Sequence, residues 1–125
     1  MRITRVFTGE DGQSHFEDLE VPMIDNPYGL ISRFVSVTGV AFRENPPGQF
    51  IDFHVAPRRQ FVVNLTGSVS LESSTGESRV IGPGEILLAE DTTGKGHISR
   101  DLDGPARRSL FLPLADDVDL TAWRA

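Results

Sequence analysis

The sequence predicts an all-β protein: a single domain of about ten short strands arranged as a sandwich or a small barrel. Three observations predict this class: dense turn signals, β-type runs between them, and no window with the 3.6-residue stripe of an amphipathic helix. The turn signals are Gly9–Gly12, Asp25–Pro27, Asn45–Gly48, Ser73–Gly76, Gly82–Gly84 and Asp103–Pro105.

The runs between these turns are expected to be strands because several alternate in polarity or are rich in Val, Ile and Phe. In chain order they are Arg2–Thr8, Leu30–Thr38, Val40–Arg43, Gln49–Val55, Gln60–Thr66, Ser68–Glu72, Ser78–Ile81, Glu85–Ala89, His97–Arg100 and Ser109–Leu114. Asp116–Trp123 is the one segment expected to form a terminal turn or short helix. The polar segment Asp11–Glu20 is assigned no strand, and its His15 is expected at the surface or at a strand edge.

Composition narrows the function classes. The chain has 125 residues, 38% hydrophobic and 24% charged, as in an ordinary globular domain. A formal net charge of -6 argues against a nucleic-acid partner, and the absence of cysteine excludes disulfides, thiolate metal sites and cysteine nucleophiles. No apolar run approaches the ~20 residues of a membrane span, so we expect a cytoplasmic protein with no membrane partner.

Two neighbouring expected strands carry polar side chains toward one place. Side chains two apart on a strand face the same way, so Asp52 and His54 are expected to share one face. Pro57 then turns the chain, and Gln60 opens the returning strand with Asn64 on the same side as itself. This hairpin is expected to bring His54 and Gln60 close together.

The spacing of the residues in and around that hairpin resembles a known family signature. Gly48, five residues, His54, five residues, Gln60, six residues and Gly67 follow one another. This layout resembles the first signature of the cupin superfamily, which is a glycine, five residues, His-x-His, three or four residues, a glutamate, six residues and a glycine. Ala56 stands at the second histidine position and Gln60 at the glutamate position, so half of the family's metal-ligand set is replaced.

A second stretch is similar to the second cupin motif, which has Pro-Gly-Asp/Glu, a strand and then a histidine. Residues 83–85 (Pro-Gly-Glu), the apolar run Ile86–Ala89 and His97 follow that order. The loop Glu90–Gly96 is longer by about two residues, and no proline precedes His97. The resemblance covers residues 30–114.

The resemblance implies a single cupin domain of the type-2 conserved-barrel kind over residues 1–125. Its fold is an antiparallel jelly-roll β-barrel or sandwich, with residues 1–29 as accessory N-terminal strands and 115–125 as a C-terminal tail. The family pairs through edge strands, which need cover, so the resemblance also implies a homodimer.

The resemblance further implies a metal site. His54, Gln60 and His97 take the ligand positions for a divalent ion such as Fe, Mn, Ni or Zn. This set is neutral and therefore weak for a dication, and Asp52 is the carboxylate that would complete it. The alternative is a metal-free pocket in which Gln60 and Asp52 only hydrogen-bond the histidines.

Three functions remain open for a small-molecule pocket. The first is a metal-dependent oxygenase, isomerase or lyase, and the second is metal-free acid–base catalysis by His54 or His97. The third is a binding or sensing module in which no bond changes. Asp52, Arg58 and Asn64 are the candidate substrate contacts, although the pair Arg58-Arg59 also fits a solvated turn.

Overall fold

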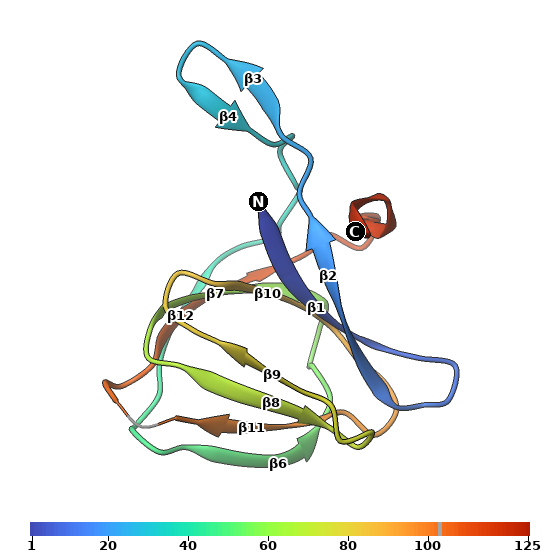
Figure 1. Cartoon of the computed structure of the whole chain (residues 1–125), viewed down its shortest axis with the longest axis vertical. Helices are drawn as coiled ribbons and strands as arrows, with labels where there is room; N and C mark the ends of the chain where they lie inside the picture. Colours follow the sequence, from blue (N-terminus) through green and yellow to red (C-terminus); the bar gives the residue numbers. More distant parts are fainter. Residues whose placement is uncertain (103) are drawn as a thin grey trace.

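The computed structural model describes residues 1–102 and 104–125, which form an all-β protein with no α-helix in that part of the chain (Figure 1). The strands are β1 (Arg2–Thr8), β2 (Ser14–Glu20), β3 (Ile24–Asn26), β4 (Gly29–Ile31), β5 (Ala41–Glu44), β6 (Phe50–His54), β7 (Gln60–Thr66), β8 (Val69–Ser73), β9 (Ser78–Ile81), β10 (Ile86–Glu90), β11 (His97–Asp101) and β12 (Arg108–Pro113). A single 3-10 turn, η1 (Thr121–Trp123), lies near the C-terminus.

The strands build two layers and a projecting arm (Figure 1). One layer is a six-stranded sheet in the order β2-β1-β10-β7-β12-β5, the other is a four-stranded sheet in the order β6-β11-β8-β9, and β3 and β4 form the arm. This arrangement is compatible with a β-sandwich.

The prediction of a purely antiparallel fold is wrong for one strand pair. β1 pairs with β10 in parallel, whereas the other ladders are antiparallel. The two strands are far apart in the chain, so no hairpin turn fixes their relative direction. The sheet is therefore mixed.

Two segments differ from the expected strands. β2 was not predicted because it is polar, yet the side chains of Ser14, Phe16 and Leu19 are buried. The expected strand over residues 30–38 contributes only its first two residues to β4, and a single bridge joins Val37 to Leu114 farther on. The predicted terminal turn is confirmed as η1.

The inner faces of the two sheets form one apolar core. Its members come from both layers, which is why the sheets stay stacked. They are Val6, Phe16, Ala56, Val62, Val69, Leu71, Ile81, Leu87 and Ala89, with Phe111 packed against them.

A second apolar cluster covers the outer face of the six-stranded sheet. Phe61 and Leu88 point into it from β7 and β10, and the C-terminal segment around η1 packs over them, with Phe61 stacked on Trp123 at 6.5 Å between ring centroids. Both faces of β7 and β10 are therefore buried. This explains why β10 is a nearly continuous apolar run and why Phe61, Val62 and Val63 follow one another in β7.

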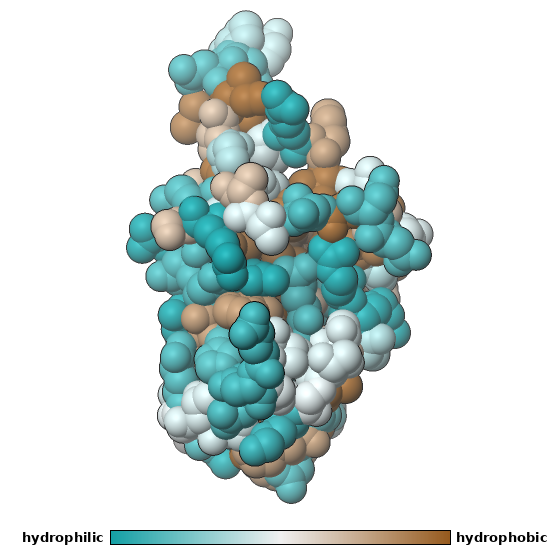
Figure 2. Space-filling model, turned by 90° about the vertical axis from the view of Figure 1, so that its right-hand side faces the viewer, coloured by the Kyte–Doolittle hydropathy of each residue, from teal (hydrophilic) through white to brown (hydrophobic). Residues whose placement is uncertain are grey.

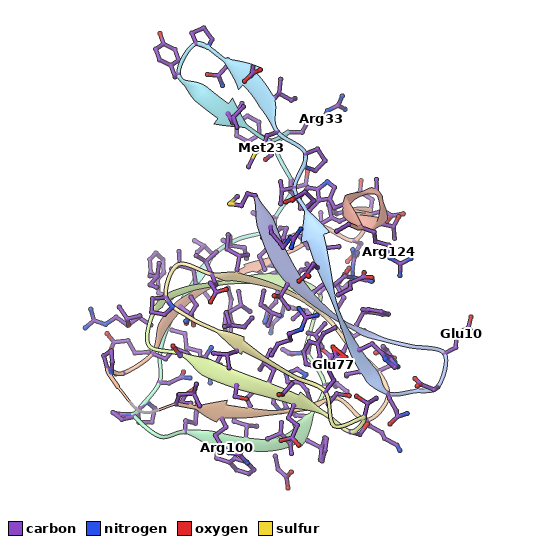
Figure 3. All side chains as sticks on the ribbon, in the orientation of Figure 1. Glu10, Met23, Arg33, Glu77, Arg100 and Arg124 are labelled. Carbon is purple, nitrogen blue, oxygen red and sulfur yellow. The ribbon has the colours of Figure 1, made fainter. Side chains whose placement is uncertain are left out.

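The arm exposes large apolar side chains. Tyr28 at its tip is 99% exposed, and Phe34 just after β4 is 97% exposed. Figure 2 shows hydrophobic surface in this projecting part, and Met23 and Arg33 mark its base in Figure 3. None of the helical structure in residues 1–102 and 104–125 is long and apolar enough to cross a membrane.

Candidate functional site

A cavity of about 180 Å³ lies between the two sheets. Its walls are mostly the apolar core, so the few polar side chains that reach it stand out as the groups able to recognise or change a ligand. The polar lining residues are Arg43, His54, Gln60, His97, Ser99 and Arg107, and the apolar ones are Ile51, Ala56, Pro57, Val62, Val69, Leu71, Ile81, Leu87, Ala89 and Phe111.

The structure brings His54 and His97 together. They are directly paired residues of the neighbouring strands β6 and β11. Their ring centroids lie 4.6 Å apart with 56° between the ring planes, and both rings line the cavity. The two imidazoles, 43 residues apart in the chain, thus form one contact between the two sheets.

His97 is held by a buried carboxylate. Its Nδ1 lies 2.6 Å from Oδ2 of Asp91, a residue with no exposed surface, which also accepts a hydrogen bond of 2.7 Å from the Ser14 hydroxyl. Because the carboxylate accepts, Nδ1 of His97 carries a proton, and in the neutral imidazole Nε2 is the nitrogen with the free lone pair. Oδ1 of Asp91 is buried with no hydrogen-bond partner among the described residues.

His54 donates a hydrogen bond through the same ring nitrogen as His97. Its Nδ1 lies 2.8 Å from the backbone oxygen of Asp52, which only accepts hydrogen bonds, so this nitrogen donates and Nε2 is the acceptor. Both imidazoles therefore offer Nε2 for proton transfer or coordination.

Gln60 also lines the cavity and is 3% exposed. Its Oε1 accepts a hydrogen bond of 3.1 Å from Nη1 of Arg58, whose own residue is exposed and outside the cavity lining. Arg59 points elsewhere: Nε donates to Glu90 at 2.7 Å and Nη2 donates to the backbone oxygen of Val118 at 2.6 Å. Arg58 thus orients the Gln60 side-chain amide, whereas Arg59 links Glu90 of β10 to the C-terminal segment at Val118.

Asp52 lies outside the cavity, contrary to the expectation that it shares a face with His54. The reason is a bulge: His97 pairs with His54 but Ser99 pairs with Ile51, so β6 has one residue more than β11 at this place. The extra residue turns Ile51 inward and leaves Asp52 exposed, with Oδ1 accepting from the Phe53 backbone at 2.8 Å.

Asn64 is buried beside the core but does not line the cavity. Its Nδ2 donates to the backbone oxygen of Gly67 at 2.7 Å, across the turn between β7 and β8. Asn64 therefore holds this turn in shape, and the structure does not bring it to His54, Gln60 and His97.

Gly96 sets how closely β11 begins beside β6. Its φ is +71°, and a Cβ added there would overlap the backbone oxygen of His54. Only glycine combines this backbone conformation with such an approach. The residue before His97 in the chain thus permits the contact between the two imidazoles.

Two arginines complete the lining. Nε of the buried Arg107 lies 3.2 Å from Oδ1 of Asp101, and Arg43 donates through Nη2 to Oε1 of Gln49 at 3.1 Å. Burial lowers the pKa of the Arg107 guanidinium. Attraction to Asp101 opposes this shift in the pKa, while repulsion from Arg43 adds to it.

Sequence reasoning missed Asp91, Ser14, Arg43 and Arg107. Asp91 follows an apolar strand and precedes Thr92-Thr93-Gly94, so it reads as part of a surface turn. Its position six residues before His97 is the only signal for it, and that spacing has no regular-structure meaning. The side of the sheet on which Arg43 lies depends on the pairing of β5 with β12. The direction of Arg107 depends on the turn that precedes β12.

The donor set is weak for the metal site that the resemblance implies. Two imidazoles and one amide carry no charge to balance a dication, and the Gln60 oxygen already accepts from Arg58. Across the described ranges 1–102 and 104–125, no group of three or more His, Asp or Glu side chains is arranged to hold a metal ion.

Comparison with known proteins adds no assignment. No protein-family model matches the chain, and no curated protein matches it.

The role of Gly96 gives a prediction. We expect Gly96→Ala to lower the free energy of unfolding by about 1–2 kcal/mol for the positive φ and ~1–3 kcal/mol more for the overlap with His54. Gly76→Ala is the matched control, because Gly76 has φ +89° but open space around it. Urea unfolding followed by tryptophan fluorescence measures both losses, and equal losses would contradict the close approach.

Proposed function

We propose that the chain is a small cupin whose cavity binds a small molecule and that His97 transfers a proton to or from it. The hydrogen bond between the buried Asp91 carboxylate and Nδ1 of His97 carries this proposal. It supports a metal-free enzyme of the isomerase or lyase class.

The chemistry follows from the tautomer. Nε2 of His97 accepts a proton from the bound compound: a C–H or O–H bond breaks, an N–H bond forms, and the electron pair stays on the compound. Asp91 stabilises the imidazolium that results without itself taking the proton. The mostly apolar walls lower the local dielectric constant, which strengthens these interactions. His54, in contact with the first ring, is placed to return or relay a proton.

The rival is a binding module with no turnover. A module of that kind needs a shaped cavity, but it has no use for an imidazole fixed in one tautomer by a buried carboxylate. Buried, partly unsatisfied carboxylates are costly, and such costs concentrate at catalytic sites. This observation supports the enzyme over the module.

Solvent exchange tests the proton transfer. We expect the protein in D2O to place deuterium on a carbon of at least one member of a panel of small 2-oxo acids, read by proton NMR. His97→Gln should abolish the exchange, and Asp91→Asn should slow it by roughly 100-fold or more, since the wrong tautomer is then favoured.

His15→Gln is the matched control, because His15 lies outside the cavity, where its Nε2 contacts the exposed Asp11 carboxylate. Thermal melting of each variant separates lost chemistry from lost fold. Equal exchange in wild type and folded His97→Gln protein, or no exchange with any member of the panel, would count against the acid–base role.

A metal site at His54, Gln60 and His97 is the second candidate. It is supported by the two Nδ1 donors, because metal-binding histidines usually donate their other ring nitrogen to an acceptor. Given the neutral donor set, we expect elemental analysis of untagged protein, purified without chelator, to find far less than one Fe, Mn, Ni or Zn per chain. Stoichiometric metal that disappears in His54→Ala would instead establish the metalloprotein.

We also propose that the chain forms a homodimer that covers the arm. An isolated two-stranded hairpin is marginally stable in water, and the arm exposes Tyr28 and Phe34 almost fully. We expect light scattering to give twice the chain mass for the wild type and the single mass for Tyr28→Ser/Phe34→Ser. Val80→Ser, at an exposed apolar site on β9 away from the arm, should stay dimeric. A monomeric wild type at high concentration would contradict the dimer.

A further inference from the structure

The polar groups of the cavity lie at two opposite ends. On the four-stranded sheet, β11 begins with His97 beside His54, continues through Ser99 and ends at Asp101, the partner of Arg107. Four residues of strand span about 13 Å. The imidazoles and the Arg107 guanidinium are thus anchored at different ends of the same strand.

The six-stranded sheet repeats this order. Along β12, Pro113 pairs with Gln60, and Ser109, four residues earlier, pairs with Arg43. Gln60 therefore lies at the histidine end and Arg43 at the arginine end. Since both sheets place their polar groups in the same direction, the cavity has one imidazole end and one guanidinium end, with mostly apolar walls and Ser99 between them.

The guanidinium end carries more positive than negative charge. Asp101 is the one carboxylate in an ion pair with either arginine within residues 1–102 and 104–125, and none of the cavity-lining residues there is acidic. Arg43 instead lies over the Phe111 ring, 5.4 Å from its centroid. One carboxylate, paired with Arg107, thus offsets two guanidiniums at this end of the cavity.

Arg107 is incompletely satisfied. Its side chain is 9% exposed, and its Nε, although 3.2 Å from Asp101, makes no aligned hydrogen bond with a described residue. Burial and the nearby Arg43 both lower the pKa of Arg107, which means that its charged form is disfavoured where it sits. A bound anion would supply the missing charge and acceptor.

We propose that Arg43 and Arg107 bind the carboxylate of a small organic monoanion whose apolar body lies along the cavity walls and whose other end meets the histidines. This inference rests on the proposed function, because it assigns the ligand class of the same cavity. Guanidinium forks suit carboxylates and phosphates alike, but one excess charge matches a carboxylate better than a phosphate of about -1.5 to -2.

The size of the cavity limits the ligand further. A volume of about 180 Å³ is below the ~300–1,000 Å³ of sites for drug-sized ligands, so a nucleotide or a sugar phosphate is too large. An acid with a branched aliphatic or single aromatic body is the class that fits both the volume and the walls.

Paired probes test the subsite. Wild-type protein labelled with 15N is titrated with benzoate and 3-methylbutanoate and with their neutral amides. We expect both acids to shift the His54 and His97 signals and to bind at least about tenfold more tightly than the amides, because a charge-assisted hydrogen bond is lost in each amide. Arg43→Gln should remove this preference.

Arg100→Gln is the matched control, because Arg100 is exposed on β11 at the outer side of the four-stranded sheet (Figure 3). It should bind as the wild type does. Arg107→Gln is the second variant, and its melting temperature shows whether it folds; folded Arg107→Gln should also lose the preference.

Each other result overturns the subsite. Equal binding of acids and amides, unchanged by Arg43→Gln, would leave a ligand cavity without an anion site. Shifts by inorganic phosphate at lower concentration than either acid would replace the carboxylate with a phosphate. Binding of none of the four probes would also overturn it. The deuterium exchange that depends on His97 is measured separately, so failure of the subsite and failure of the proposed function are distinguishable.

Discussion

The buried carboxylate of Asp91 is the interaction on which the site depends. Its Oδ2 holds Ser14 of β2 and His97 of β11, and its backbone oxygen accepts from the Ala56 backbone just after β6 at 3.0 Å. Ser14 is tied in turn to the Ser73 hydroxyl at the end of β8. One residue thus joins both sheets at the histidine end of the cavity.

The close contact of the imidazoles needs backbone geometry as well as this anchor. His97 meets His54 because Gly96 lets one strand begin against the carbonyl of the other. The bulge in β6 then sends Ile51 inward, so the next wall position beside the rings is apolar. Strand pairing alone would have put an aspartate there. The lining between the imidazoles and the arginines is therefore mostly apolar, with Ser99 as its polar member.

Local pattern predicted most of the strands, because alternation and turn residues act over a few positions. The approach of His54 to a distant histidine followed from such spacing and from the resemblance. The expected hairpin of β6 and β7 is wrong, because β6 pairs with β11 in one sheet and β7 pairs with β10 and β12 in the other. His54 and Gln60 nevertheless both line the cavity. β2 could not be predicted in this way, because its polar sequence does not show the burial that it gains by pairing with β1. The exposure of Asp52 could not be predicted either, because a β-bulge has no sequence signature of its own. Asp91 and Arg107 gain their roles only from tertiary neighbours, which a single sequence does not show.

The two ends of the cavity offer different chemistry to one ligand: guanidiniums at one end and imidazoles at the other. This difference bears on whether the ligand is chemically changed or only bound. Arg43 and Arg107 alone would suffice to retain a small anion, with the apolar walls excluding larger ones. The opposite end adds an imidazole whose proton is fixed on Nδ1 by a carboxylate that folding must bury. Binding gains little from that arrangement, whereas proton transfer requires it. The proposed anion, fixed by its charge at one end, would present its other end to a base, which is the arrangement that proximity-based catalysis needs.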